Sequence, residues 1–263
     1  GAMLDPRAAP DPCAPRDLSR RPPRFLSRVT APFGAPLTGS VVPGYSTRIV
    51  NVQVGEHAYR LRVLGDLQQF ADPDGLGADL GISSAQWSLF GQLWPSGRLL
   101  AQTMERADVA GKRILETGCG IGLSSLVLQR RGAIVVASDI HPLTEGFLAY
   151  NAALNALDAV HYRQMRWDVA LTTLGRFDMI IASDVLYERA HAALLADVVE
   201  RYAQPSAEVV ISDPGRGNSA ALSRLLDAQG FSLQESRAGI DNEADALPRG
   251  RILHYRRAMG RLQ

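Results

Sequence analysis

Lysine is almost missing from this 263-residue chain, and cysteine is scarce. Lys112 is the single lysine, so nearly all of the 28 basic residues are arginines. We interpret this usage as the mark of a GC-rich, bacterial genome. The two cysteines, Cys13 and Cys119, lie far apart, which argues against a disulfide framework and predicts a reducing, cytoplasmic compartment.

Strong net charge and long apolar runs are also absent. Lys and Arg total 28 while Asp and Glu total 27, so the formal net charge is +1. This balance gives no electrostatic basis for binding nucleic acid or a membrane surface. No apolar run approaches the ~20 residues of a membrane-spanning helix. A chain of this length can bury one substantial core.

The chain divides into three predicted parts. Residues 1–45 hold most of the 15 prolines, several arginines and few periodic apolar positions, which predicts a flexible arm. Gly1 to Met3 at its start is interpreted as the remnant of a cleaved tag. Residues 46–90 are predicted to form an extension with a β-hairpin and a long loop at 66–86, and residues 91–263 form the main domain.

Strands and helices alternate along the main domain. Short apolar runs predict parallel strands, and three- and four-residue apolar spacing predicts helices between them. Two late strands without a helix between them predict an antiparallel pair at one edge. The pattern therefore predicts an α/β, Rossmann-like fold, a seven-stranded, mostly parallel sheet with helices on both faces. The expected strands are 113–115, 134–137, 160–165, 177–182, 208–212, 231–235 and 252–255.

The most informative segment follows the first of these strands and runs from Glu116 to Gly122. Its glycines, Gly118, Gly120 and Gly122, permit a tight turn and a close approach of the backbone to a ligand at the carboxyl end of the sheet. The third glycine comes one residue too early for a nicotinamide fingerprint, and no phosphate-binding Gly-Lys-Ser/Thr follows. Glu116 attracts a cation, and the ammonium of S-adenosylmethionine fits. A tight turn without a ligand is the alternative.

The ends of the next two strands supply further candidates. Asp139 is placed to accept both ribose hydroxyls of such a cofactor, with Ile140 against the adenine. Asp168 is placed to accept the adenine amino group, with the indole of Trp167 packed beside it. The alternatives are a helix cap for Asp139, a surface acid for Asp168 and a core tryptophan for Trp167.

The fourth strand ends in Ser183-Asp184-Val185-Leu186-Tyr187. We expect this strand beside the first one, so that Asp184 and Tyr187 face the reactive end of the cofactor. The alternatives are that Asp184 caps the next helix and that Tyr187 only packs. No metal site is predicted, because His141 and His161 have no carboxylate or cysteine at metal-ligand spacing.

Residues 85–258 resemble the class I S-adenosylmethionine-dependent methyltransferases. The segment from Glu116 to Gly122 matches their first motif, and Asp139 matches the acidic end of the second. Within that superfamily the chain is similar to methyltransferase family 16, the seven-strand protein lysine methyltransferases. The similarity lies in the Trp-Pro segment 93–101, in the Asp-x-x-Tyr motif 184–187, and in the preceding hairpin.

This resemblance implies a cofactor, S-adenosylmethionine, and an acceptor, a protein lysine amine that receives a methyl group by in-line displacement. It implies that Trp94 contacts the cofactor and that Asp184 and Tyr187 orient the amine. Small-molecule N- or O-methyl transfer and a non-catalytic cofactor-binding module remain alternatives. The sequence predicts no oligomeric state. The full set of expected cofactor residues is Trp94, Glu116, Gly118, Cys119, Gly120, Gly122, Asp139, Ile140, Trp167, Asp168 and Ser183.

Overall fold

The computed structural model describes residues 45–237 and 250–258, which belong to one compact unit spanning 41–263. The predicted arm, residues 1–45, lies outside the described residues except for Tyr45. The strands are β1 (Thr47–Val54), β2 (His57–Leu64), β3 (Arg113–Thr117), β4 (Ile134–Asp139), β5 (His161–Gln164), β6 (Phe177–Ser183), β7 (Ala203–Asp213), β8 (Ser232–Arg237) and β9 (Arg251–Arg257). The helices are α1 (Leu76–Asp79), α2 (Ser84–Trp87), η1 (Ser88–Gly91), α3 (Pro95–Arg106), α4 (Leu123–Arg130), α5 (Thr144–Leu154), α6 (His191–Tyr202) and α7 (Ser219–Ala228).

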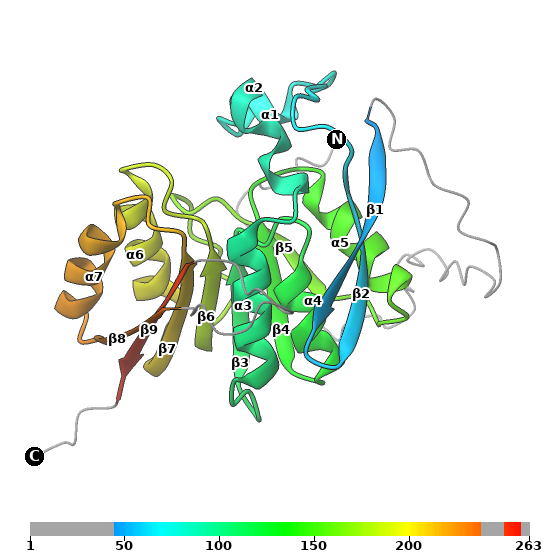
Figure 1. Cartoon of the computed structure of the whole chain (residues 1–263). Coiled ribbons are helices and arrows are strands. Elements are labelled where there is room, and N and C mark those ends of the chain that lie inside the picture. Colours follow the sequence, from blue (N-terminus) through cyan, green and yellow to red (C-terminus); the bar gives the residue numbers. More distant parts are fainter. Residues whose placement is uncertain (1–44, 238–249, 259–263) are drawn as a thin grey trace, which may run out of the picture. The chain divides into compact units, whose positions relative to one another are not determined.

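The main sheet has seven strands in the order β5-β4-β3-β6-β7-β9-β8 (Figure 1). The first five are parallel, and β9 pairs antiparallel with β7 and β8. The predicted mostly parallel sheet with an antiparallel edge pair is confirmed. Because the chain leaves β3 toward β4 and later returns to β6 on the other side, the strand order reverses between β3 and β6. In such sheets the ligand crevice lies at this reversal, beyond the carboxyl ends of the strands.

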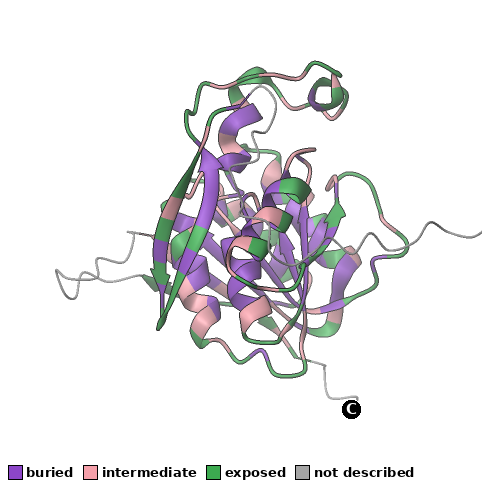
Figure 2. Cartoon of the chain, turned by 90° about the vertical axis from the view of Figure 1, so that its right-hand side faces the viewer, coloured by how far each residue is buried: buried purple, intermediate pink, exposed green. Residues whose placement is uncertain are grey.

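Alternate side chains of each central strand point to opposite faces of the sheet, as strand geometry requires. Ile114, Met179 and Val210 join one buried cluster, which also holds apolar residues of α3, α4 and α5. Leu115 and Ile180 join a second cluster with residues of α6 and α7. Figure 2 shows the buried strands between helices whose outer sides are exposed. Helices therefore cover both faces, as predicted, and none of those described is long and apolar enough to cross a membrane.

The predicted hairpin forms a separate two-stranded sheet, β1 with β2. Two asparagine side chains, Asn151 of α5 and Asn155 directly after this helix, bind the backbone of β2. The Arg62 N–H donates to Asn151 Oδ1 at 2.7 Å, and the Arg60 N–H donates to Asn155 Oδ1 at 2.9 Å. Asn151 also donates to the Ile121 carbonyl at 3.1 Å, so the same residue links the hairpin to the glycine segment.

The predicted loop 66–86 contains local structure that we did not expect. Apolar periodicity does not indicate its two short helices, α1 and α2, which have side-chain hydrogen bonds close to their N-terminal ends. The Asp72 carboxylate accepts the N–H groups of Gly77 and Ala78 at 2.9 and 3.1 Å. The buried Trp87 then donates its indole N–H to the Tyr45 hydroxyl at 2.6 Å. These contacts pack the segment against the core.

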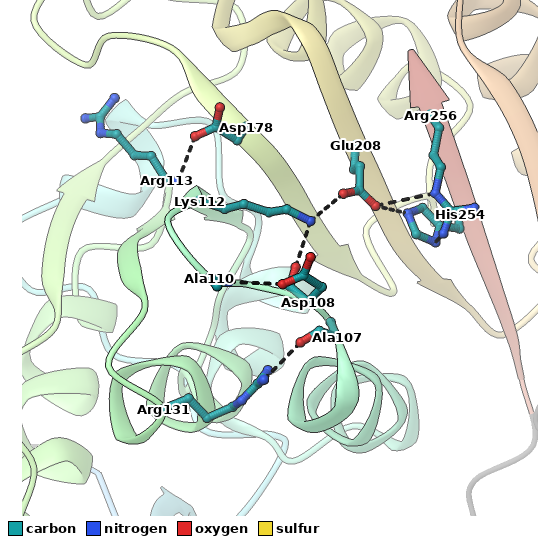
Figure 3. Close-up of polar contacts among 10 residues, drawn as sticks. All are labelled: Ala107, Asp108, Ala110, Lys112, Arg113, Arg131, Asp178, Glu208, His254 and Arg256. Carbon is teal, nitrogen blue, oxygen red and sulfur yellow. Dashed lines mark hydrogen bonds and ion pairs between the residues drawn. The ribbon is translucent and has the colours of Figure 1, made fainter. Parts of the chain in front are cut away.

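A polar network ties the sheet together at the end of β3 remote from the glycine segment (Figure 3). Lys112, just before β3, donates to Glu208 of β7 at 2.6 Å and to the Asp108 carbonyl at 2.7 Å. Glu208 also contacts His254 Nε2 at 2.6 Å. The single lysine of the chain is therefore held in a structural ion pair.

Candidate functional site

A cavity of about 680 Å³ lies at the carboxyl ends of the central strands. Its walls include both predicted catalytic residues and every predicted cofactor residue except Gly122. Residues that are distant in the sequence thus converge on one concave site. Gly122 is not among the lining residues; it directly precedes the first residue of α4.

The glycine segment needs glycine for close packing as well as for backbone conformation. Gly120 has a φ of +52°, and a Cβ there would lie 2.8 Å from the Phe90 carbonyl oxygen. Gly122 has a φ of +82°, and its Cβ would lie 2.2 Å from a methyl carbon of Leu148. Both distances are shorter than real contacts allow. The turn therefore fits tightly under the extension and against α5.

Glu116 is a buried carboxyl group on the cavity wall. Its side chain accepts a hydrogen bond from the Ser125 hydroxyl. Burial raises its pKa to about 7, against the opposing effect of Ser125, and the nearby Asp139 charge raises it further. Among the described residues no cation forms an ion pair with Glu116. The site therefore contains an acidic group whose charge is uncompensated and faces a cavity.

Asp139 is fixed by two backbone donors. Its Oδ2 accepts the Gly120 N–H and its Oδ1 accepts the His141 N–H, both at 2.9 Å. Burial raises the Asp139 pKa, and these hydrogen bonds oppose the rise. Its side chain does not cap α5, which begins at Thr144 without a side-chain cap. The helix-cap alternative is wrong, and Asp139 instead joins two loops of the cavity, with half-buried Ile140 beside it.

Asp168 and Trp167 lie at the rim. Asp168 forms a two-bond pair with Arg166, at 3.0 Å to Nε and 2.7 Å to Nη2, which lowers the Asp168 pKa. Trp167 donates its indole N–H to the Thr117 hydroxyl at 2.6 Å. Trp94, which also lines the cavity, donates its indole N–H to the Leu89 carbonyl at 2.8 Å. The two indoles are thus held by hydrogen bonds while their rings line the cavity.

Asp184 follows β6 and does not cap α6, since α6 begins only at His191. Its backbone has a φ of +51°, and its N–H donates to the Ser212 carbonyl of β7 at 2.9 Å. Its carboxylate pairs with Arg216, with Nε at 2.5 Å and Nη2 at 2.8 Å. This arginine was not predicted from the sequence. Its position after a strand, in Gly215-Arg216-Gly217, was the available signal.

Tyr187 lies in the same cavity wall, where its ring meets the edge of His191 at a centroid distance of 4.5 Å. Desolvation by the cavity walls raises the Tyr187 pKa to about 12, together with the charges of Asp139, Glu188 and Asp184. The hydroxyl is therefore a hydrogen-bond donor at neutral pH.

The extension completes the cavity through contacts that sequence reasoning did not identify. His141, next to the predicted ribose acid, stacks on Phe90 with ring centroids 3.8 Å apart. Burial lowers the His141 pKa to about 3, so this ring is neutral. Gln86 of α2 donates a hydrogen bond from its Nε2 to Oε1 of Glu188, in the segment after β6, at 2.5 Å. In the part of the chain that the structure describes, no group of three or more His, Cys, Asp or Glu side chains is arranged to hold a metal ion.

Comparison with known proteins agrees with this geometry. The electron transfer flavoprotein beta subunit lysine methyltransferase of Xenopus laevis is 27% identical over 157 residues, covering 57% of this chain and 62% of that protein. The ubiquinone biosynthesis O-methyltransferase of Pseudomonas aeruginosa (strain LESB58) is 33% identical over 129 residues, covering 48% and 54%. The chain thus spans less than two thirds of the length of these relatives.

Solved structures share the fold at low identity. A 16S rRNA methyltransferase of T. thermophilus matches with a TM-score of 0.54 at 19% identity, covering 81% of this chain and 51% of that one. A family model described as lysine methyltransferase matches residues 80–221, which is more than half of the chain and includes every predicted site residue. The resemblance seen in the motifs is confirmed, and the chain belongs to this lysine methyltransferase family.

Proposed function

We propose that this protein is an S-adenosylmethionine-dependent methyltransferase that methylates a lysine side chain of a protein. The observation that carries the proposal is the uncompensated Glu116 carboxyl on the cavity wall, next to a close-packed glycine turn and the fixed Asp139. A cofactor with one ammonium and one ribose offers a partner to each acid. The matched family model supports the same activity.

The residues present fit this cofactor. Glu116 would bind its ammonium, because a cation relieves the cost of an ionised carboxyl in a buried position. Asp139 would accept the ribose hydroxyls on the lone pairs that Gly120 and His141 leave free. When bound, S-adenosylmethionine supplies an electrophilic methyl group on a positively charged sulfur. Trp94, Ile140 and Trp167 contribute apolar surface that excludes water.

The acceptor end of the cavity is formed by Asp184 and Tyr187. A lysine amine with a pKa near ~10.4 is mostly protonated in water, and an apolar cleft favours its neutral form. Asp184 would accept a hydrogen bond from the amine and so direct its lone pair. Tyr187 offers a hydroxyl donor and a ring face to the developing cation. Alignment of this kind can lower a barrier by ~7–11 kcal/mol.

Small-molecule methylation is the second candidate. The similarity to the ubiquinone biosynthesis O-methyltransferase favours it, since that protein reaches a higher identity over a shorter span than the Xenopus relative. The two candidates share a cofactor site and differ only in the acceptor.

Calorimetry with S-adenosylhomocysteine tests the cofactor site. We expect binding by the wild-type protein and a large loss of affinity in Asp139→Ala. Asp227→Ala serves as a control, because Asp227 is exposed on α7 and lies outside the cavity wall. Wild-type affinity in Asp139→Ala would rule out the ribose assignment, and no binding by any variant would rule out the proposed activity.

The acceptor is tested by adding the purified protein and labelled S-adenosylmethionine to a cell lysate. Label in protein bands, located on lysine by mass spectrometry, is expected. Label confined to the low-mass fraction would support the second candidate instead. Asp184→Asn should keep its affinity for S-adenosylhomocysteine while transfer falls, and unchanged transfer would exclude Asp184 from the reaction.

A further inference from the structure

Asp184 and Arg216 form a bidentate ion pair on the wall of the cavity. Nε of Arg216 lies 2.5 Å from Oδ1 of Asp184, and Nη2 lies 2.8 Å from Oδ2. Both carboxylate oxygens therefore receive a charge-assisted hydrogen bond, the strongest form of this pairing. Both residues line the cavity, so the ion pair lies where an acceptor would meet Asp184 under the proposed function.

The two partners differ in how firmly they are held. The Asp184 side chain is 11% exposed, and its backbone N–H is bonded to β7. The Arg216 side chain is 45% exposed and stands between Gly215 and Gly217, whose φ angles are +95° and +92°. A Cβ at either glycine would meet no atom within 4 Å. The segment that carries the arginine therefore has open space around it, and Arg216 is the partner that can move.

The charge of the arginine matters for the choice of acceptor. A lysine ammonium and a guanidinium compete for the same carboxylate, because each brings one positive charge and N–H donors. A hydroxyl group brings no charge, so it cannot replace the guanidinium without leaving the carboxylate poorly compensated. The neighbouring acid Asp213 is paired with a different arginine, since its Oδ2 lies 2.5 Å from Nη2 of Arg251. Arg216 therefore forms its hydrogen bonds with Asp184.

We propose that Arg216 is a latch on Asp184 that a cationic amine displaces and an uncharged hydroxyl does not. This inference rests on the proposed function, in which Asp184 receives the acceptor. With no acceptor present, the latch keeps Asp184 compensated. An ammonium that enters exchanges with the guanidinium on the same oxygens, and it must then release one proton to water before its nitrogen has a lone pair for the methyl group. The guanidinium and an entering ammonium therefore compete for the Asp184 carboxylate, whereas a hydroxyl group leaves the ion pair in place.

The test uses n-butylammonium chloride as a lysine mimic and n-butanol as its uncharged counterpart. Each is titrated into the protein by nuclear magnetic resonance at constant chloride concentration, with and without S-adenosylhomocysteine. Removing the latch in Arg216→Ala should tighten butylammonium binding by about tenfold, as expected when a closed state no longer competes, and leave butanol unchanged. Arg189→Ala, which removes an exposed arginine outside the cavity wall, should match the wild type.

Equal butylammonium affinity in the wild type and Arg216→Ala, or binding by neither, overturns the latch. So does an equal gain for butanol, which would mean that the arginine only blocks space. Loss of the S-adenosylhomocysteine signal, in contrast, contradicts the proposed function without bearing on the amine titration. A kinetic readout adds a second criterion, since a latch predicts a lower KM for the acceptor in Arg216→Ala. A lower kcat at unchanged KM would make Arg216 a fixed support for Asp184 and would also overturn the proposal.

Discussion

At the scale of single residues, Glu116 carries opposite consequences for stability and for binding. Its folded pKa of about 7 lies above the ordinary value of 4.5, so between these pH values the folded protein holds more protons than the unfolded chain. Its contribution to stability therefore falls as pH rises through this window and stays at its lowest above pH 7. A bound cation reverses this cost, because it favours the ionised form.

Glu116→Gln should separate the two effects. We expect the variant to be more stable than the wild type at pH 8, on the order of 1–3 kcal/mol at about 1.4 kcal/mol per pKa unit, and similar to it at pH 5. Urea unfolding at both pH values measures this. The affinity of the variant for S-adenosylhomocysteine should fall, and it should lack the pH dependence between 6 and 8 that we expect for the wild type. Ser125→Ala is the control, and it should lower stability at pH 8 because the carboxylate loses its hydrogen bond.

At the scale of elements, the hairpin forms no strand pair with the main sheet, and two asparagines, one in α5 and one directly after it, bind its backbone. Asn151 is buried; its side chain accepts the Arg62 N–H and donates to the Ile121 carbonyl. Asn155 lies nearer to solvent, and its side chain accepts the Arg60 N–H. The sequence predicted each element but not this docking, because nothing in periodicity indicates that an amide will pair with a distant strand backbone.

Asn151→Ala should therefore cost more stability than Asn155→Ala. The first leaves buried backbone groups without partners, at about 1–3 kcal/mol each, while water can replace the second. Urea unfolding at pH 7 compares the two variants. A cost in Asn155→Ala equal to or above that in Asn151→Ala would contradict this view of how the hairpin is attached.

At the scale of the whole molecule, the stacked His141 joins the extension to the main domain. It meets Phe90 and Trp87 of the extension at centroid distances of 3.8 and 4.4 Å, and burial lowers its pKa to about 3. The unfolded chain takes up a proton on this histidine near its ordinary pKa of 6.5 while the folded protein does not. Stability from His141 is therefore present above about pH 6.5 and lost as pH falls toward 3.

His141→Phe keeps an aromatic ring and removes this titration. We expect its stability to decline less than that of the wild type between pH 6.5 and 4.5, by up to about 1.4 kcal/mol per pH unit. The slope of unfolding free energy against pH is the quantity to compare, since the absolute stability also changes with the ring. His161→Gln, at an exposed strand position, should keep the wild-type slope. Equal slopes in all three proteins would exclude His141 as the acid-sensitive contact.

Local patterns were enough to predict the sheet, its antiparallel edge and the meeting of Glu116, Asp139 and Asp184 at one edge. Parallel strands bring their carboxyl ends together, so residues that follow those strands must converge wherever the fold forms. The short helices at 76–79 and 84–87 were not predicted, because their local hydrogen bonds to Asp72 and Gln86 leave no apolar period in the sequence. Gly122, which was expected to bind the cofactor, is not among the residues that line the cavity, and a Cβ there would lie 2.2 Å from a methyl carbon of Leu148.

The sequence by itself determined the layered fold and the acids at the switch point, because strand and helix periods and glycine turns are encoded within short segments. Tertiary structure alone decided which groups compensate those acids. Arg216 binds Asp184, which lies 32 residues earlier in the sequence. His141 stacks on Phe90, which lies in the extension, far from it in the sequence. Glu116, by contrast, finds no described cation. Charge compensation depends on distances in space, and no spacing along the chain specifies them.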